Sequence, residues 1–263
     1  KPLDKNVDLK RFAARTPGFS GADLANVMNE AAILAAKEGR KTILQDDFYK
    51  SIEKVMMGPE RKSRVISDKE KEKVACHEAG HAVTAAAIKD SDPVHKISIV
   101  SRGRMGGYTL KLPLDEDRLR TKSQFMADLA VMMGGYASEQ IFFGDISTGA
   151  SNDLKEATSL ARALVTRFGM SDLGPITFGR GEEMVFLGRE MTTEKNYSEN
   201  VASKIDEEVK KFIDNSHKRA TKILTTYKAA VKKVSEELIK KETLEQEEFY
   251  SLIKEFNLKP IRA

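Results

Sequence analysis

His77-Glu78-Ala79-Gly80-His81, an H-E-x-x-H motif, is the most informative stretch of this 263-residue chain. Residues four apart on a helix lie about 40° apart around the axis and about 6 Å apart along it, so the imidazoles of His77 and His81 face one point. A zinc ion binds imidazole nitrogens at about 2.0–2.1 Å, which suits such a pair. Glu78 points sideways from the pair and can reach a water molecule on the metal, where a carboxylate acts as general base and then as proton donor.

The motif lies in a predicted helix that is rich in small residues and that Ser67 can cap. Gly80 inside a helix costs about 1 kcal/mol relative to alanine, so its presence predicts the close approach of another backbone or of a substrate. Chance is the competing explanation of the motif. Two histidines and a glutamate on a buried face are poor core residues, however, unless something satisfies their polar groups.

A catalytic zinc needs a third protein ligand and an open position for water. A longer form of the motif would carry a third histidine at position 87, which is Ala87 here. We interpret His95, at the start of a predicted strand, and His217, in a charged helix, as ordinary residues. The remaining candidates are Glu139, on a helix among apolar residues, and Asp153, which opens a helix where an aspartate also serves as a cap. The residues alone leave these two open.

Composition excludes several classes of protein. Apolar residues make up 40% of the chain and charged residues 32%, which is ample for a folded core. The net charge of +4 is nearly balanced, and a dedicated nucleic-acid binder would show a clustered basic excess. No run approaches 18 apolar residues and the first residues form no apolar signal region, so we expect neither a membrane span nor a secretory peptide here. The sequence also lacks a GxxxxGK[ST] nucleotide motif.

The chain divides into two predicted units, with the boundary in the basic stretch that follows Gly58-Pro59. Apolar residues at helical spacing predict two helices in the first unit, residues 1–58. The second unit, residues 59–263, has four predicted helical regions and two β-like runs. The predicted helices are 21–38 (capped by Ser20), 45–57, 67–89, 122–142, 151–169 (capped by Ser151 or Asn152) and 194–256 (broken near Glu242-Thr243); the β-like runs are 95–100 and 107–112. We therefore expect a mainly α fold with a small β-sheet.

The sequence is similar to a known family in both units. The blocks HEAGHAV (77–83), TGASNDLKEAT (148–158) and GMSDLGP (169–175) resemble the FtsH family of membrane-anchored AAA+ zinc metalloproteases. The segments 16–40 and 46–62 resemble the C-terminal helical lid of that family's AAA+ module. The resemblance extends from residue 1 to about residue 255, and the motif blocks in this order are highly specific.

The resemblance implies a fold and a site. The fold is a helical AAA+ lid at 1–58, followed by a mostly helical H-E-x-x-H zinc peptidase domain at 59–263. In the family pattern, His77, His81 and Asp153 bind one Zn²⁺ per chain and Glu78 is the catalytic acid/base. Glu139 then either orients a zinc-bound histidine or is a structural carboxylate. The family's Walker motifs and transmembrane segments are missing from this sequence, so ATP and Mg²⁺ are expected only in a full-length parent.

The implied function is that of a zinc-dependent endopeptidase domain. The parent would be an ATP-dependent, processive, membrane-anchored protease that degrades unfolded and membrane proteins in quality control. The implied partners are unfolded or membrane-extracted polypeptides, other copies in a homo-hexamer, and a membrane reached through segments absent from this sequence; no nucleic acid is expected. The expected location is a bacterial inner membrane with the peptidase facing the cytoplasm, or an organelle membrane. The charged region 194–256 is either a solvated helical wall or a subunit interface.

An extended substrate is expected to pair with an exposed strand edge at 97–100 or 107–112, unless the two strands form a hairpin with both edges covered. Two other functions compete with proteolysis. One is a catalytically silent, ring-forming scaffold with a structural metal, although a structural zinc needs no adjacent general base such as Glu78. The other is a nucleotide-binding regulatory module, which the missing P-loop opposes.

Overall fold

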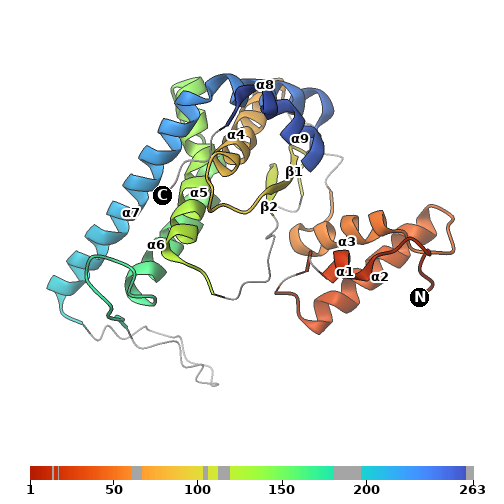
Figure 1. Ribbon diagram of the computed structural model, residues 1–263, viewed down its shortest axis with the longest axis horizontal. Coiled ribbons are helices and arrows are strands. Elements are labelled where there is room, and N and C mark those ends of the chain that lie inside the picture. The colour runs from red at the N-terminus through yellow and green to blue at the C-terminus, as the bar shows by residue number, and fades with distance from the viewer. Residues whose placement is uncertain are drawn as a thin grey trace.

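The computed structural model describes residues 1–13, 15–16, 18–60, 67–102, 106–111, 119–179 and 197–258. The basic stretch chosen as the domain boundary (61–66), the end of the second β-like run (112) and residues 194–196 lie outside the described residues. The fold is mainly helical with one small sheet, which confirms the predicted fold class. A small helical unit at the N-terminus lies beside a larger unit that contains the sheet (Figure 1).

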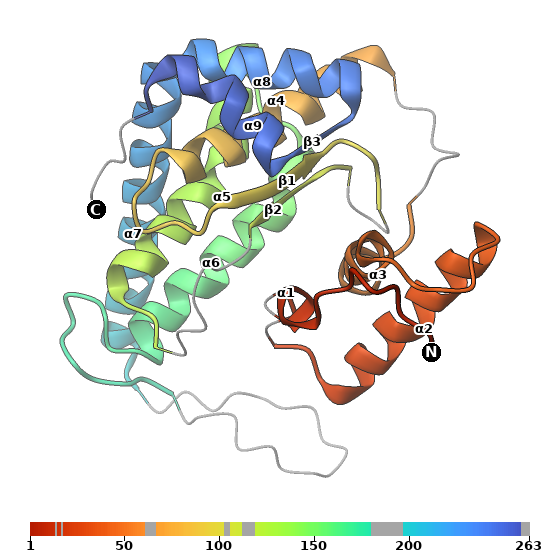
Figure 2. The same ribbon diagram turned by 45° about the vertical axis from the view of Figure 1, so that its right-hand side comes forward.

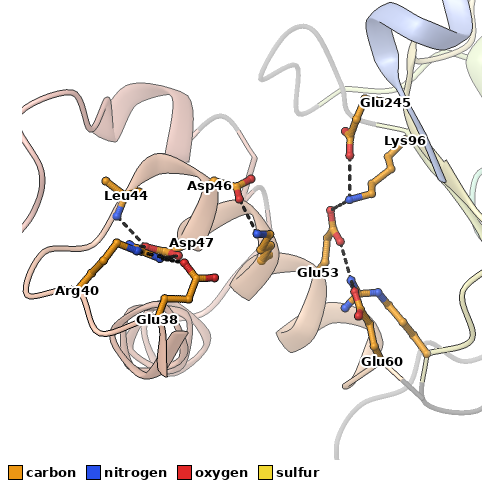
Figure 3. Close-up of polar contacts among 11 residues, drawn as sticks. Glu38, Arg40, Leu44, Asp46, Asp47, Glu53, Glu60, Lys96 and Glu245 are labelled. Atoms are coloured by element: carbon orange, nitrogen blue, oxygen red, sulfur yellow. Dashed lines mark hydrogen bonds and ion pairs between the residues drawn. The ribbon is translucent and has the colours of Figure 1, made fainter. Parts of the chain in front are cut away.

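The N-terminal unit consists of α1 (Leu9–Ala13), α2 (Gly21–Lys37) and α3 (Gln45–Met57). Ser20 caps α2 as predicted: its hydroxyl accepts from the amide of Asp23, and the Asp23 carboxylate accepts from the Ser20 amide. In the turn before α3, Arg40 pairs with the buried Asp47, which also accepts from the Leu44 amide (Figure 3). A core of its own joins the helices, formed by Val27, Ala31, Ala35, Ile43, Phe48 and Ile52.

The larger unit is built around α4 (Asp68–Ala86), whose C-terminal half is buried among α5, α7 and α8 (Figure 2). This central position explains the small residues of α4, because close neighbours on several sides leave little room for side chains. The other helices of this unit are α5 (Lys122–Phe143), α6 (Ser151–Thr166), α7 (Glu199–Thr226), α8 (Lys228–Lys241) and α9 (Gln246–Ile253), with short 3₁₀ turns at Thr148–Ala150 and Lys254–Phe256. No helix in the described ranges is long and apolar enough to cross a membrane.

The sheet has three antiparallel strands in the order β2-β1-β3. They are β1 (Val94–Ser98), β2 (Tyr108–Lys111) and β3 (Thr243–Glu245). Ile97 lies opposite Thr109 on one side and Leu244 on the other. The prediction of an open edge at 97–100 is therefore wrong over the part of that run that lies in β1, because this strand is paired on both sides. Among the described strands, β2 lies at the edge of the sheet on the side away from β1.

Three local predictions differ from the structure. Helix α4 ends at Ala86 rather than at residue 89. Neither Ser151 nor Asn152 caps α6; instead Ser147 caps the 3₁₀ turn that leads into the helix. The break near Glu242 contains strand β3, which was not predicted because three residues are too few for an alternating pattern.

Candidate metal centre

The site depends on a close crossing of α4 and α5. A Cβ atom added to Gly80 would lie 2.5 Å from the carbonyl oxygen of Gly134, and one added to Gly134 would lie 2.8 Å from the carbonyl oxygen of Gly80. These distances are far below van der Waals contact, so the two backbones meet as closely as glycine permits. The prediction of a close approach at Gly80 is confirmed, and the neighbour is a backbone. Next to the crossing, Gly135 leaves room for the His77 ring, since a Cβ there would lie 2.3 Å from Cε1 of that ring.

Three donor atoms from two helices converge beside this crossing. Nε2 of His77 lies 3.0 Å from Nε2 of His81 and 3.1 Å from Oδ2 of Asp153, and the last two atoms are 3.4 Å apart. Ligands about 2.0–2.1 Å from a tetrahedral zinc ion lie about 3.3 Å from one another. The spacing and the donor set, two imidazole nitrogens and one carboxylate oxygen, therefore fit zinc. Within the described residues, this is the group of histidine, cysteine and acidic side chains arranged to hold a metal ion.

The second nitrogen of each imidazole has a partner that fixes the ring. Nδ1 of His77 lies 2.7 Å from Oε1 of Glu139, and Nδ1 of His81 lies 2.7 Å from the carbonyl oxygen of Val131. Both partners are acceptors, so each Nδ1 carries a proton, and each Nε2 is the nitrogen whose lone pair is available to a metal ion once any proton there is displaced. The choice of tautomer is thus set by α5, on which Val131 and Glu139 lie.

Glu139 and Asp153, the two candidates left open by the residues, both contact His77 but on opposite sides of the ring. Asp153, in the first turn of α6, faces Nε2, and Glu139 faces Nδ1. The other oxygen of Glu139 accepts from the amide of Ser147 at 2.6 Å, so Glu139 also secures the loop that leads to Asp153. One buried carboxylate therefore positions both a histidine and the segment that carries the third donor.

The electrostatics match a site built for a cation. Burial alone would lower the pKa of His77, but the bonds to Asp153 and Glu139 outweigh it and raise the pKa to about 10. Burial would likewise raise the pKa of Asp153, but the bonds from His77 and His81 hold it well below its ordinary range. A proton is thus strongly held where the three donors meet, and a divalent cation that binds there displaces it.

Glu78 lies outside the three-donor group, on the neighbouring face of α4, and is buried. Burial raises the pKa of its carboxyl above the ordinary value, against the opposing effect of the two histidines. Oε2 accepts a hydrogen bond of 2.8 Å from the hydroxyl of Thr109 in β2. The other histidines lie elsewhere: His95 is in β1, and His217 in α7 packs edge-on against Tyr136.

Sequence reasoning missed the residues that support the site from outside the motif, namely Thr109, Gly107 and Val131. Val131 acts through its backbone, so its side chain carries no signal. Gly107 and Thr109 lie in the β-like run at 107–112, and nothing in the spacing of that run indicated that it faces α4.

Comparison with known proteins agrees with this geometry. Residues 64–252 match the model of peptidase family M41, and residues 6–50 match that of the AAA+ lid domain. The chain belongs to peptidase family M41. The predicted resemblance to the FtsH family is thereby confirmed, since relatives that carry this name match nearly the whole M41 chain.

One relative, "ATP-dependent zinc metalloprotease FtsH 1" of Thermomicrobium roseum, is 51% identical over 261 residues, which is 99% of this chain and 40% of the relative. The "ATP-dependent zinc metalloprotease FtsH" of Thermotoga maritima is 48% identical over 257 residues, 97% of this chain and 42% of the relative. The protein of the same name from Veillonella parvula is 46% identical over 255 residues, 97% of this chain and 40% of the relative. The M41 chain therefore spans about two fifths of the length of these relatives.

Proposed function

We propose that this chain is the zinc endopeptidase part of an ATP-dependent protease, with His77, His81 and Asp153 as the metal ligands and Glu78 as the general base. The observation that carries the proposal is the convergence of three donor atoms within 3.0–3.4 Å of one another. Three protein ligands leave the fourth tetrahedral position for water, which is the pattern of a catalytic rather than a structural zinc. The names and the family of the relatives support the same chemistry.

When bound, zinc supplies an activated water molecule and polarises the peptide carbonyl. Glu78 takes a proton from the attacking water as the water oxygen bonds to the peptide carbonyl carbon, so that one O–H bond breaks and another forms on the carboxylate of Glu78. It then delivers that proton to the nitrogen of the leaving amine as the C–N bond breaks. A carboxylate whose pKa is raised by burial suits both steps, because it holds the proton more firmly than an exposed one and still releases it to an amine.

The substrates we propose are unfolded or membrane-extracted polypeptides, bound in extended form along the side of β2 that no other described strand occupies. Pairing of this kind reads the backbone and places few demands on side chains, which suits a broad range of substrates. We further propose that the parent is a homo-hexamer anchored in a membrane through segments outside this sequence, with its nucleotide bound in the ATPase core.

The test is a paired measurement on one preparation of each protein: wild type, Glu78→Gln and Asp153→Ala. Zinc per chain is quantified by metal analysis and hydrolysis is followed with casein. We expect one zinc per chain in wild type and Glu78→Gln, less in Asp153→Ala, and hydrolysis only in wild type. Full zinc content in Asp153→Ala would overturn the ligand assignment. Bound zinc in the wild type with no hydrolysis by it would favour the silent scaffold.

A further inference from the structure

Strand β2 supports the carboxylate of Glu78 from across a helix–sheet contact. The hydroxyl of Thr109 lies 2.8 Å from Oε2 of Glu78 and 3.2 Å from its carbonyl oxygen. A hydroxyl has one hydrogen to donate, and the shorter contact goes to the charged acceptor, which forms the stronger bond. In the described part of the chain, this is the hydrogen bond that holds the side chain of Glu78.

The second carboxylate oxygen lies against the same strand. A Cβ atom on Gly107 would lie 2.9 Å from Oε1 of Glu78, so the missing side chain provides the space that this oxygen occupies. Residues two apart on an extended chain face the same way, and Gly107 and Thr109 therefore form one surface. Gly107 leaves space for one oxygen of the Glu78 carboxylate, and Thr109 donates a hydrogen bond to the other.

Contacts with β1 and with α5 fix the position of the surface formed by Gly107 and Thr109. Thr109 lies opposite the fully buried Ile97 of β1, the central strand of the sheet. At the end of β2, the ammonium of Lys111 lies 2.8 Å from Oδ1 of Asp128 in α5, the same helix that orients the two histidines. The donor to Glu78 is thus fixed relative to the metal ligands, as a preorganised base requires.

We propose that Thr109 is a positioning residue for proteolysis: its hydroxyl holds the Glu78 carboxylate in the one orientation that exchanges protons with the attacking water and the leaving amine. The inference rests on the proposed role of Glu78 as general base. A glutamate without this bond rotates about its last side-chain bonds, and misplacement by about 1 Å is enough to slow a positioned reaction by up to about a hundredfold.

The first test compares Thr109→Val, which keeps the shape and loses the hydroxyl, with Thr109→Ser, which keeps the hydroxyl. Bound zinc, kcat and KM for a peptide substrate are measured in the full chain. We expect Thr109→Val to lower kcat at least about tenfold, with KM and zinc content close to wild type, and Thr109→Ser to recover most of the loss. Thr226→Val is the matched control, because that hydroxyl donates to the carbonyl of Lys222 within α7 and makes no other bond to the described residues.

A wild-type kcat in Thr109→Val, or a change confined to KM, would overturn the proposal. So would a loss of kcat that Thr109→Ser does not restore.

The second test is independent of activity and uses the chelator-treated, zinc-free chain. Thermal unfolding is compared for Thr109→Val, Glu78→Ala and the double variant. We expect Thr109→Val to lower the unfolding temperature by about 2–4 °C in the wild-type background and by much less when Glu78 is already alanine. Additive shifts would mean that the hydroxyl does not bond to the carboxylate, and the proposal would fall. If the two substitutions are not additive but Glu78→Gln remains active, the hydrogen bond between Thr109 and Glu78 exists and it is the proposed role of Glu78 as general base that fails.

Discussion

Glu53, near the end of α3, and Arg102, which follows β1, form a buried ion pair with 2.9 Å between Oε2 and the guanidinium nitrogen. Their side chains are 7% and 6% exposed, and Lys96 of β1 approaches the other oxygen of Glu53 at 2.9 Å (Figure 3). The hydroxyl of Tyr108 in β2 donates to the same glutamate. A single carboxylate from the N-terminal helical unit thus contacts Lys96 and Tyr108 of the sheet and Arg102 beyond it, while Lys96 also pairs with Glu245 and Arg102 with Glu60.

Glu53→Gln is expected to destabilise the chain by about 1.5–3 kcal/mol, because Lys96 and Arg102 lose their shared buried partner and keep only the pairs with Glu245 and Glu60. Chemical denaturation measures the loss. Glu30→Gln serves as the control: Glu30 also forms an ion pair, with Lys54, but within the N-terminal unit, so its loss should cost less than about 1 kcal/mol. Equal costs for the two variants would contradict a special role for the contact between the units.

Gly80→Ala is expected to force α4 and α5 apart, because the added Cβ has no space beside the carbonyl oxygen of Gly134. We expect a loss of about 2–3 kcal/mol of unfolding free energy and impaired zinc binding, measured on the same preparation. Gly21→Ala is the matched control, since Gly21 begins α2 and has nothing within 4 Å of an added Cβ. Alanine is ordinarily favoured over glycine in helices, so a stabilised Gly80→Ala variant would refute the close crossing.

Glu139→Ala is expected to weaken zinc binding by about 10–100-fold. The substitution frees Nδ1 of His77 and releases the Ser147 amide that secures the loop before Asp153. Competition with a chromogenic chelator measures the affinity. Asp145→Ala tests specificity, because Asp145 is an exposed acidic residue of the same loop whose carboxylate, among the described residues, accepts from the amide of Ile146 alone. Wild-type affinity in Glu139→Ala would mean that the carboxylate is structural only.

Asp128 provides a prediction about pH. Burial would raise the pKa of its carboxyl, but the pairs with Lys111 and Arg120 hold it below the ordinary 3.8. A lowered pKa in the folded state stabilises the fold fully above the ordinary value, and this contribution is lost as the pH falls through the folded value. Asp128→Asn should therefore be less stable than wild type by about 1–2 kcal/mol at pH 7, with the gap closing below about pH 4. Urea denaturation of both proteins at several pH values measures the difference in unfolding free energy. A difference that stays constant with pH would rule out a lowered pKa of Asp128 in the folded state.

The features that the sequence predicted are those encoded locally. Ser20 and Asp23 are three positions apart, and His77 and His81 are one helical turn apart, so their contacts follow from helix geometry alone. The choice between Glu139 and Asp153 as the third metal ligand could not be made from helix geometry. It depends on the direction from which each carboxylate approaches the His77 ring, and that direction is set by how α5 and α6 pack.

Contacts between distant segments also explain what was missed. Strand β3 forms only because Leu244 meets Ile97, almost 150 positions earlier in the chain. Thr109 is an ordinary strand residue until α4 packs on its face, and no spacing rule connects it to Glu78. The peptidase motif could thus be predicted from the sequence, whereas the parts that hold it in place could not.

Strand β2 is four residues long, and two neighbours on it face in opposite directions. Tyr108 bonds to Glu53 of the N-terminal unit, while Thr109 bonds to Glu78 beside the candidate metal centre. The two residues that make these contacts are consecutive in the chain and are joined by one peptide bond. A rotation of the N-terminal unit that displaces Tyr108 would therefore also shift Thr109 and its hydrogen bond to Glu78, so the orientation of the proposed general base is coupled to the position of a helical unit that contributes no atom to the candidate metal centre.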